Sequence, residues 1–527
     1  MLQHLITAAG LNVQTYLASI TISLQIGSAF LATLIAWRIW KFTILPLFRP
    51  DDPVELPYWI PYFGHAGAYL KDSHGLMKKA IKRFGTMEPF SLTIAGDRYY
   101  VITSPADTRP FFANASALTI DGFLDRSLIA FGCAPGRLDK MWQLNAPSRL
   151  NPKGKSLVNL TEDLFKQDLV PGLPFDVIVE RYQKALDGLL SWDRLVGVHP
   201  SLVGTGPGGR TEPISLYDLC TDIVVNANLR VFFAPALLAI DSNMAVEIRT
   251  FTDGLWKLFD RSRFADITDV AKLRHQYISV FRNYLQLPPQ SRNSEMRVIR
   301  NLVEVYSEMG IHEDDQAAVL FMIWWATSAN AYRAAFWVLA YILHDPQLRE
   351  IVRQETASAV GRDGKLNWSY LTKECPRLFS IYYEVLRLTK RDLIFRKVVR
   401  DTIVAGKQLR RGGIAVIPTC QLHDNPETYG PDAASFNPDR FLQSKNLDNT
   451  NKALLAFGGG RHYCPGHQVA ALEIIGFAAV MINQFNIKVA WPDPFPQRDD
   501  SLITLGISRP VPGDDLYVTL ASDSRGL

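Results

Sequence analysis

The sequence predicts a mainly α-helical protein with small β-sheets, an α+β fold, preceded by one transmembrane helix at the N-terminus. Three observations predict it. Helix-like patterns dominate residues 155–350, strand-like runs with glycine turns occur at 88–104 and 394–420, and no Asp, Glu, Lys or Arg precedes Arg38. Because no internal repeat is visible, one large body accounts for the 527 residues better than the roughly three domains that length alone suggests.

The composition is that of a folded protein with a concentrated apolar segment. Hydrophobic residues make up 47% and charged residues 20% of the chain, which excludes a disordered or collagen-like protein. Lys and Arg number 56 against 52 Asp and Glu, and the net charge of +4 gives no basic excess for nucleic acid. The mean hydropathy of 0.00 is high for so many charges, so apolar residues must be concentrated somewhere.

Residues 1–45 are predicted to form a membrane anchor, with the transmembrane helix at about 17–37. This stretch, LASITISLQIGSAFLATLIAW, is uncharged and long enough to cross a bilayer, which takes about 20 residues. Arg38, Lys41 and Arg49 follow on one side only, so the positive-inside rule places the body in the cytoplasm. A cleaved signal peptide is the alternative, but the segment lacks a basic leading region and is too long.

A proline-rich segment, 46–62, follows the anchor and is predicted to be a hinge, because repeated proline blocks helix formation. The catalytic body then extends over 63–527. Along it we expect a helix at 65–85, two strands at 88–104 around a turn at 95–97, a glycine loop at 203–209, strands at 394–420, and a last helix at 465–485 before a β-like tail. No Lys-Ser/Thr follows the glycine loop, so it is not a phosphate-binding loop.

The longest apolar stretch of the body, 317–343, is predicted to be one long helix. It contains Asn330 and Arg333 near its middle, and a charged side chain at bilayer depth is costly. We therefore expect a helix buried inside a large protein rather than a second transmembrane span. Acidic residues at 314 and 315 suit its N-terminal end, and Asp345 followed by proline stops it.

Residues 457–466, FGGGRHYCPG, carry the clearest chemical signal. Three consecutive glycines let the backbone lie flat against a broad group, and Cys464 comes just before a helix that we expect Pro465 to open. A cysteine at a helix N-terminus near Arg461 has a stabilised thiolate. A single thiolate suits a metal held mainly by something else, such as a porphyrin; a free thiol beside a flexible loop is the alternative. The other cysteines (133, 220, 375 and 420) show no zinc-binding spacing and are predicted to be ordinary buried thiols.

These residues resemble the haem-binding loop of the cytochrome P450 family, in its microsomal type. The loop matches the family's Phe-x-x-Gly-x-Arg-x-Cys-x-Gly pattern at every fixed position. The resemblance implies the P450 fold and a haem b with Cys464 as the axial metal ligand, favouring O–O cleavage. It also implies that Phe457 packs beside the sulfur, that Arg461 binds a haem propionate, and that Gly458 and Gly466 belong to the cofactor-binding loop.

Two further motifs support the resemblance. Glu384 and Arg387 stand three residues apart on a helix, which places both charges on one face. Arg440 lies in a second family motif, FNPDRF. The resemblance implies that these three residues form a buried charge network with a structural role, since a carboxylate shared by two guanidiniums is tolerated inside a protein.

Other cations are candidates for the propionates. The resemblance favours Arg396 over Arg400 as a second partner. A third is expected near residues 145–160, where Arg149, Lys153 and Lys155 remain open.

The helix over the haem departs from the family pattern. P450 hydroxylases commonly place an acid and an alcohol there to relay protons, but the corresponding positions hold Ala329 and Asn330. Asn330 can hold water or bind substrate, and it cannot act as an acid at neutral pH. Thr327 and Ser328 lie close by and are expected to organise water instead. We therefore take Asn330, Ala329 and Thr327 as the candidate catalytic positions.

This helix, with the segment around Ile60–Gly64, more weakly resembles the branch of cholesterol 7α-hydroxylase, sterol 12α-hydroxylase and prostacyclin synthase. The resemblance implies a membrane-anchored haem-thiolate monooxygenase of the endoplasmic reticulum, single-pass with a cytosolic catalytic domain, acting in specialised or lipid metabolism. NADPH-cytochrome P450 reductase, with cytochrome b5 as a further donor, would supply electrons. The apolar stretches 120–130, 324–330, 393–394 and 502–507 would line a site for a sterol, terpenoid or polyketide. The alternative functions are a haem-thiolate isomerase or dehydratase acting on a peroxide, and a non-catalytic haem sensor.

Overall fold

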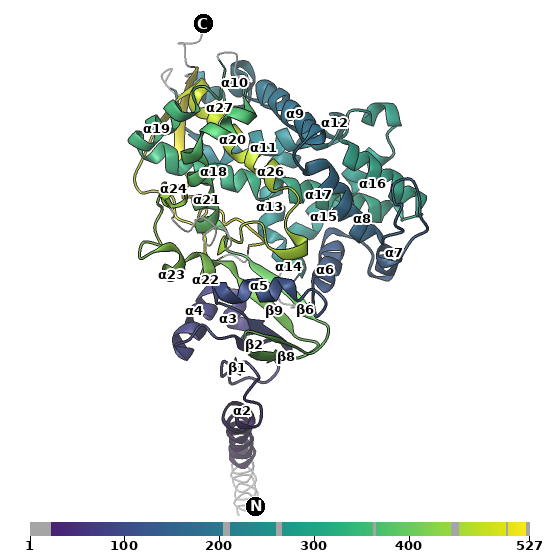
Figure 1. The fold of residues 1–527 in the computed structure, drawn as a ribbon, viewed down its shortest axis with the longest axis vertical. Coiled ribbons are helices and arrows are strands. Elements are labelled where there is room, and N and C mark those ends of the chain that lie inside the picture. The colour runs from purple at the N-terminus through teal and green to yellow at the C-terminus, as the bar shows by residue number, and fades with distance from the viewer. Residues whose placement is uncertain are drawn as a thin grey trace, which may run out of the picture. The chain divides into compact units, whose positions relative to one another are not determined.

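The computed structural model describes residues 23–203, 211–259, 266–361, 365–443, 453–501 and 504–522. The chain divides into two compact units. Unit 1 comprises Met1–Lys71, Gly75–Leu118 and Lys397–Val416, and unit 2 comprises Asp72–His74, Thr119–Arg396 and Ile417–Leu527. The predicted α+β class is confirmed, because helices dominate and the strands form only small sheets (Figure 1).

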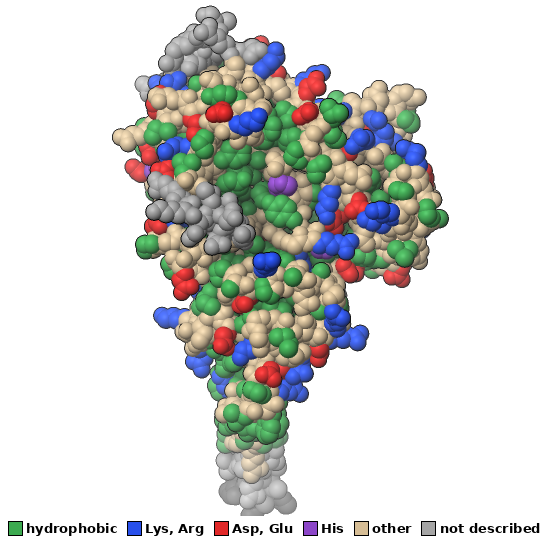
Figure 2. All heavy atoms as spheres, viewed as in Figure 1, with side chains coloured by type: hydrophobic (Ala, Val, Ile, Leu, Met, Phe, Trp, Pro, Cys, Tyr) green, Lys and Arg blue, Asp and Glu red, His purple; other side chains and the backbone are tan. Residues whose placement is uncertain are grey.

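An exposed apolar helix opens the described part of unit 1. It spans Ser23–Phe48, has a mean hydropathy of 1.4 and buries none of its most apolar window. Hydrophobic side chains cover its surface (Figure 2). Its 26 residues exceed the about 20 needed to cross a bilayer, so the helix has the length and composition of a membrane span.

This helix ends later than the sequence predicts. Instead of stopping near Trp37 it continues through a π-helical segment, η1 (Trp40–Ile44), into α2 (Leu45–Phe48). Pro46 stands in the first turn of α2, where a missing N–H costs least, so proline does not end the helix here. Residues 17–22 of the predicted span lie outside the described part of the chain.

The end of the helix packs against the segment that was predicted to be a hinge. The ring of Tyr58 lies 5.7 Å from that of Trp37 and 5.2 Å from that of Phe42. Lys41 forms an ion pair with Glu55 at 3.3 Å. Within unit 1, the helix is therefore joined to the residues that follow by ring contacts and charge pairing rather than by a bare proline linker.

A small sheet organises the rest of unit 1. Strands β1 (Val54–Glu55) and β2 (Phe90–Ile94) are parallel, β2 and β3 (Asp97–Val101) are antiparallel, and β3 pairs in parallel with β9 (Ile414–Pro418). The turn at Ala95 and Gly96 has positive φ angles of 50° and 87°, as the glycine there predicts. The remaining elements are α3 (Ala66–Lys71), α4 (Ser73–Phe84), α5 (Pro105–Ala113), β7 (Thr402–Val404) and β8 (Lys407–Leu409). Helices α3 and α4 together occupy the predicted helical stretch 65–85. Strands β2 and β3 lie within the predicted 88–104, and β7, β8 and β9 lie within the predicted 394–420.

Unit 2 consists mostly of helices. In chain order these are α6 (Asp121–Phe131), α7 (Leu138–Trp142), α8 (Leu157–Leu169), α9 (Leu173–Leu189), α10 (Trp192–Val198), α11 (Leu216–Phe232), α12 (Ala236–Ile240), α13 (Met244–Gly254), α14 (Trp256–Phe259), α15 (Thr268–Leu285), α16 (Arg297–Glu308), α17 (Glu313–Ser328), α18 (Ala331–His344), α19 (Pro346–Thr356), α20 (Trp368–Glu374), α21 (Pro376–Thr389), α22 (Thr419–His423), α23 (Pro426–Tyr429), α24 (Arg440–Gln443), α26 (His467–Ala471) and α27 (Phe477–Gln484). Strands β10 (Phe485–Val489), β11 (Tyr517–Ser522) and β5 (Ile214–Ser215) form an antiparallel sheet. The remaining strands are β4 (Leu118–Thr119) and β6 (Leu393–Val398).

The apolar stretch at 317–343 lies in the core of unit 2, as predicted. Phe321 and Trp324 of α17 are fully buried and contact the rings of Tyr277 and Phe281 on α15. Arg333 is also buried, with 2% of its surface exposed, and Asp253 balances its charge at 2.6 Å. A paired cation inside a protein core is tolerated, which agrees with a core helix rather than a second membrane span.

The stretch is nevertheless two helices and not one. Helix α17 ends at Ser328 and α18 begins at Ala331. At the break, the carbonyl of Thr327 accepts a hydrogen bond from the side chain of Asn228 on α11, at 2.8 Å. A side chain thus occupies an acceptor that a continuous helix would use internally, and this explains the interruption.

The last predicted helix is also modified. It begins at His467 rather than Pro465, because Gly466 occupies the cap position and its carbonyl accepts from the N–H of Ala470 at 2.8 Å. A π-helical segment, η6 (Leu472–Gly476), interrupts it before α27. Most of the predicted glycine loop at 203–209 lies outside the described residues, so the structure says nothing of it.

Candidate active site

The glycine-rich loop before α26 presents Cys464. Gly458 and Gly460 have φ angles of +74° and +68°, which side chains other than glycine rarely adopt. The N–H of Cys464 donates to the carbonyl of Phe457 at 3.0 Å and closes the loop on itself. The glycines therefore set the backbone path that delivers the cysteine.

The Cys464 thiol is accessible although protein surrounds it. It is exposed, whereas the other four cysteines are buried. Burial nevertheless raises its pKa, while the N–H of Gly466 and the charge of Lys390 act to lower it. Burial is the larger effect, so the pKa of the Cys464 thiol lies above its ordinary value despite these two neighbours.

The remaining cysteines lack these features. Burial raises the pKa of Cys133 and of Cys375 to about 12, and it raises that of Cys220 well above its ordinary value. Cys420 is buried and lies 2.9 Å from Nδ1 of His74. None of the four follows a glycine loop, so they fit the ordinary buried thiols that the sequence predicts.

Helix α8 holds the cysteine loop from outside. Nδ1 of His462 lies 3.2 Å from a carboxylate oxygen of Glu162, and Lys166 donates to the carbonyl of Arg461 at 3.2 Å. Although burial opposes it, hydrogen bonds from His462 and Lys166 lower the pKa of Glu162 to about 2. This contact could not be predicted from the sequence, because Glu162 and Lys166 have the spacing of an ordinary charged helix face.

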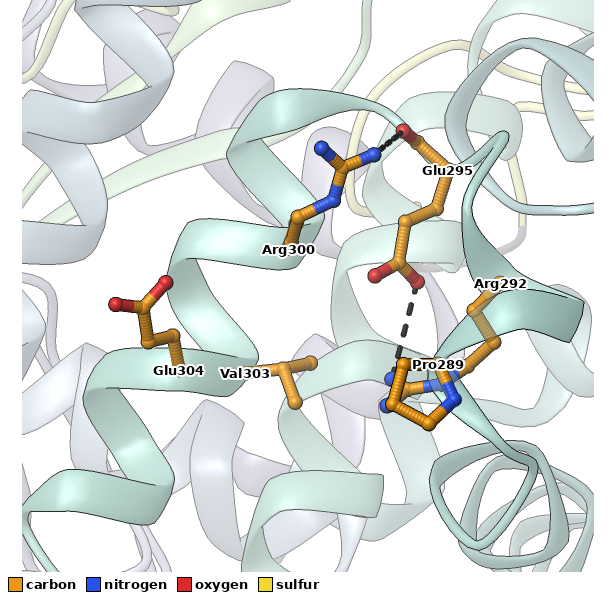
Figure 3. A pocket seen from close by; sticks show the side chains of 6 residues that line it. All are labelled: Pro289, Arg292, Glu295, Arg300, Val303 and Glu304. Atoms are coloured by element: carbon orange, nitrogen blue, oxygen red, sulfur yellow. Dashed lines mark hydrogen bonds and ion pairs between the residues drawn. The ribbon is translucent and has the colours of Figure 1, made fainter.

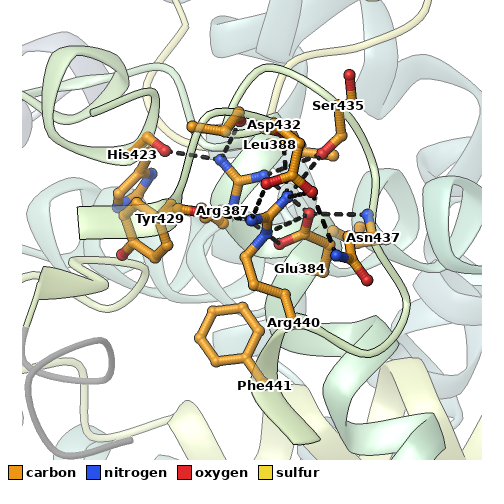
Figure 4. A network of polar contacts seen from close by, with 12 residues as sticks. Glu384, Arg387, Leu388, His423, Tyr429, Asp432, Ser435, Asn437, Arg440 and Phe441 are labelled. Carbon is orange, nitrogen blue, oxygen red and sulfur yellow. Dashed lines mark hydrogen bonds and ion pairs between the residues drawn. The ribbon is translucent and has the colours of Figure 1, made fainter. Parts of the chain in front are cut away.

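The three residues of the predicted charge network lie together in unit 2 (Figure 4). Arg387 donates two hydrogen bonds of 2.8 Å to the two oxygens of Glu384, and Nε of Arg440 lies 3.0 Å from both. Glu384 and Arg387 are fully buried, and Arg440 is nearly so. One carboxylate is thus shared by two guanidiniums away from water, where pairing is strongest.

The network ties α21 to the irregular segment that follows α22. Arg387 also donates to the carbonyls of His423 and Ala433, at 2.7 and 2.6 Å. Arg440 forms an ion pair with Asp432 at 3.0 Å. These bonds fix a stretch with little regular structure, which leads along the chain to the cysteine loop.

The predicted propionate partners differ in their surroundings. Arg396 is buried, and burial lowers its pKa to about 10, whereas Arg461 is exposed. Arg400 bonds the hydroxyl of Ser116 at 2.6 Å. Of the three further candidates, Arg149 pairs with Glu304, Lys155 pairs with Asp163, and Lys153 is exposed. The geometry does not choose among these three.

The candidate catalytic positions lie at the break between α17 and α18. Thr327 is half-buried and its hydroxyl donates to the carbonyl of Trp324 at 2.9 Å. Ala329 is buried, but Ala326 one turn earlier is exposed. The side-chain oxygen of Asn330 accepts from the N–H of Ile507 at 2.8 Å. The break therefore brings Thr327 and Asn330 to an accessible face, while the Ala329 methyl group points into the core.

The break between α17 and α18 contacts a segment far away in the sequence. Ile507, which binds Asn330, forms an antiparallel bridge with Lys390 at the end of α21. Lys390 is in turn the residue whose charge acts on the Cys464 thiol. Ile507 thus links the break between α17 and α18 to the end of α21 within unit 2.

These residues fit a metal held by a macrocycle and one protein thiolate. Cys464 and Arg461 of the same loop are exposed, and Arg396 is a buried cation, so the chain offers one thiolate for a metal and guanidiniums for anionic substituents. Among the residues that the structure describes, no cluster of three or more His, Cys, Asp or Glu could hold a metal ion. Of the five cysteines, Cys464 is the exposed one, and its thiolate fits a haem-thiolate centre.

A separate small cavity lies elsewhere in unit 2 (Figure 3). Its volume is about 200 Å³, and it is lined by Pro289, Arg292, Glu295, Arg300, Val303 and Glu304. It contains none of the predicted site residues.

Comparison with known proteins agrees with this geometry. A family model described as cytochrome P450 matches residues 211–516. A cytochrome P450 monooxygenase of Penicillium oxalicum is 24% identical over 475 residues, covering 88% of this chain and 93% of that protein. The 7-alpha-hydroxycholest-4-en-3-one 12-alpha-hydroxylase of Oryctolagus cuniculus is 23% identical, covering 88% of this chain and 92% of that protein.

The fold matches a solved structure as well. A retinoic acid-bound cyanobacterial cytochrome P450 superposes with a TM-score of 0.65 at 20% identity, over 90% of this chain and 99% of that chain. The predicted family and the weaker similarity to sterol hydroxylases are both confirmed. The chain belongs to the cytochrome P450 family, whose members hold haem through a cysteine thiolate.

Proposed function

We propose that this P450 monooxygenase is membrane-anchored and oxidises a lipophilic small molecule, such as a sterol, terpenoid or polyketide. The observation that carries the proposal is the accessible thiol of Cys464 on its glycine loop, beside the break of the distal helix. Relatives named as fungal P450 monooxygenases and as sterol 12-alpha-hydroxylases support oxidation of a lipophilic substrate.

Cys464 is the haem ligand in this proposal. Phe457, Gly458 and Gly466 form the loop that carries it, while Arg461 and the buried Arg396 bind the propionates. Haem ligated by a thiolate supplies oxygen activation. Within the chain, the N–H of Gly466 and the charge of Lys390 favour the thiolate, whereas burial raises the pKa of Cys464 and favours the thiol.

Asn330 and Thr327 organise the opposite side of the site. Since the oxygen of Asn330 accepts from Ile507, the orientation of the amide is fixed, and its N–H₂ group is a donor of fixed direction. Such a donor holds a water or an acceptor oxygen of the substrate. Ala329 has no titratable group, so protons reach the site through water and not through a side-chain acid at this position.

Aromatic side chains supply the apolar wall. The ring of Phe123 stacks between Phe259 and Phe395, at centroid distances of 5.6 and 6.0 Å. All three belong to unit 2; Phe123 lies in a stretch predicted to line the substrate site, and Phe395 directly follows another, 393–394. Flat, apolar side chains of this kind suit a rigid hydrocarbon skeleton.

The N-terminal helix is the membrane anchor of the proposed enzyme. Arg38, Lys41 and Arg49 lie near its end and place the body in the cytosol, on the endoplasmic reticulum. In this proposal the anchor comprises residues 1–45, the hinge 46–62 and the catalytic body 63–527, and the anchor helix continues to Phe48. NADPH-cytochrome P450 reductase, and cytochrome b5 as a further donor, supply electrons from the same side.

Turnover with two oxidant systems tests the function. The full-length enzyme is supplied with a panel of sterols, terpenoids and polyketides, with either NADPH, reductase and oxygen or an organic peroxide alone. We expect products that require NADPH and oxygen and that gain one oxygen atom. Rearranged products formed from a peroxide substrate without NADPH would overturn the proposal in favour of an isomerase or dehydratase.

A further inference from the structure

Helix α18 binds the backbone of a distant segment, Gly506–Ser508, with three side chains. Asn330 accepts from the N–H of Ile507 at 2.8 Å, Arg333 donates to the carbonyl of Ile507 at 2.9 Å, and Trp337 donates to the carbonyl of Ser508 at 2.8 Å. Positions 330, 333 and 337 repeat at helical spacing and so share one face. These side chains thus bind both the N–H and the carbonyl of Ile507.

The same segment is bonded on its other side by the end of α21. The N–H of Arg391 donates to the carbonyl of Gly506 at 3.1 Å, and the N–H of Ser508 donates to that of Thr389 at 2.8 Å. The segment is therefore clamped between two elements. Leu505, just before it, is the half-buried apolar side chain that this clamp presents.

Gly506 shows how close the contact is. A Cβ atom added there would lie 2.1 Å from the side-chain oxygen of Asn330, well inside van der Waals contact. Only glycine lets the backbone approach Asn330 this closely. The pair Asn330 and Gly506 therefore fits together as a unit, which the sequence alone did not suggest.

Arg333 extends the clamp to α13. Its guanidinium is 2% exposed and forms an ion pair of 2.6 Å with Asp253 at the end of that helix. Asp253 also binds Arg509, which pairs with Asp499 at 3.1 Å. Two arginines and two carboxylates thus join α13, α18 and the residues that flank the clamped segment, and the buried charge of Arg333 is balanced.

We propose that Asn330 and Arg333 are positioning residues, which fix the segment Gly506–Ser508, and with it Leu505, at the substrate side of the site. The inference rests on the proposed function, and it gives Asn330 a role through its oxygen that is separate from donation by its amide nitrogen. Shape selectivity of the site then depends on the clamp.

Azole binding measures this selectivity without a known substrate. An azole nitrogen ligates haem iron and shifts the Soret band, so the dissociation constants of imidazole and of 4-phenylimidazole can be measured on the full-length holoenzyme. Imidazole reports the metal site alone, while the phenyl ring of the larger probe also contacts the distal wall. The ratio of the two constants is the readout, because a loss of folded protein leaves it unchanged.

The variants separate the two ends of the Asn330 amide. Asn330→Leu removes the acceptor for Ile507, whereas Asn330→Asp keeps an acceptor oxygen, loses the amide donor and introduces a carboxylate charge. One hydrogen bond corresponds to about 1 kcal/mol, so we expect Asn330→Leu and Arg333→Met each to change the ratio about fivefold. Asn330→Asp should stay near the wild-type ratio. So should Arg297→Gln, a control that removes the ion pair of Arg297 with the buried Asp168 elsewhere in unit 2.

The outcomes are distinguishable. An equal change in Asn330→Asp and Asn330→Leu would overturn the inference, because the donor and not the clamp would then matter. An unchanged ratio in both Asn330→Leu and Arg333→Met would also overturn it. If Arg333→Met does not retain haem, Arg333→Lys is used in its place. Lysine keeps the positive charge but lacks the planar guanidinium, whose separate nitrogens bind Asp253 and Ile507. Absence of any Soret shift in the wild type would instead overturn the proposed haem site itself.

Discussion

Replacing Glu384 by Gln tests the buried charge network most severely. The substitution keeps the shape of the side chain but removes the one negative charge that two guanidiniums share. Glu384 and Arg387 are 0% exposed and Arg440 is 7% exposed, so water cannot replace the lost charge. Asp432, the other carboxylate on Arg440, has a side chain that is 48% exposed.

The size of the effect follows from burial. Removing one partner of a buried ion pair costs about 3–5 kcal/mol, since an uncompensated charge stays in the core. Here Arg387 loses its counter-charge, Arg440 keeps the partly exposed Asp432, and Asn437 also loses the carboxylate that accepts its N–H at 3.0 Å. We therefore expect Glu384→Gln to lose about 3–5 kcal/mol of unfolding free energy, which corresponds to a Tm lower by several degrees, together with weaker haem retention.

A matched control exists on α19. Glu350 and Arg353 have the same spacing of three residues and a similar pair of hydrogen bonds, at 2.8 and 2.9 Å, but both side chains are exposed. The assay is thermal unfolding of the full-length protein in detergent, followed by circular dichroism and by the Soret band. Glu350→Gln should melt like the wild type. Equal melting temperatures for Glu384→Gln and Glu350→Gln would refute the argument that burial gives the network its strength.

Three further predictions concern pH, the cysteine loop and the membrane. Burial, reinforced by neighbouring cations, keeps the pKa of His423 well below its ordinary value, so below about pH 6.5 only the unfolded chain gains this proton and stability decreases as the pH is lowered. His423→Gln, which can still accept from the N–H of Leu455, should therefore show a shallower fall of Tm between pH 6.5 and 5. An unchanged slope would contradict the assignment. Glu162→Gln removes the carboxylate that holds His462, so haem should dissociate faster in a transfer assay to apomyoglobin while Tm changes little; a wild-type rate would show that α8 does not hold the loop. A chain that lacks residues 1–48 should leave the membrane pellet and still bind haem, and its continued sedimentation with membranes would show a second membrane contact.

The cysteine loop could be predicted because its conformation depends on local residues. Gly458 and Gly460 adopt the positive φ angles that only glycine adopts readily, and the cysteine follows at a fixed distance. The spacing of Glu384 and Arg387 on one helix face was local as well. Arg440 was different, because only the resemblance to a family linked it to that helix.

Features that depend on distant segments escaped the sequence. The distal helix divides at Asn330 because Asn228 on α11 binds the Thr327 carbonyl and because Ile507 binds Asn330 itself. No pattern within 317–343 contains these partners. The helical periodicity there was correctly identified, but the hydrogen bonds that interrupt it come from more than 90 residues away in the chain.

The N-terminal helix shows the same limit in a milder form. Proline at 46 was expected to end the helix region, yet its place after a π-helical segment leaves it without a lost hydrogen bond. The packing of Tyr58 against Trp37 and Phe42 joins the predicted hinge to the helix. Proline spacing predicts local stiffness, but it does not reveal which rings will meet.

The most direct test of the account is the reduced-CO difference spectrum of two cysteine variants. Cys464→Ala should lose the band that thiolate-ligated haem gives, because the accessible sulfur beside Gly466 would be gone. Cys420→Ala, which removes a buried thiol next to His74, should keep it. Loss of the band in Cys420→Ala with retention in Cys464→Ala would contradict the assignment of the haem ligand and, with it, the site described above.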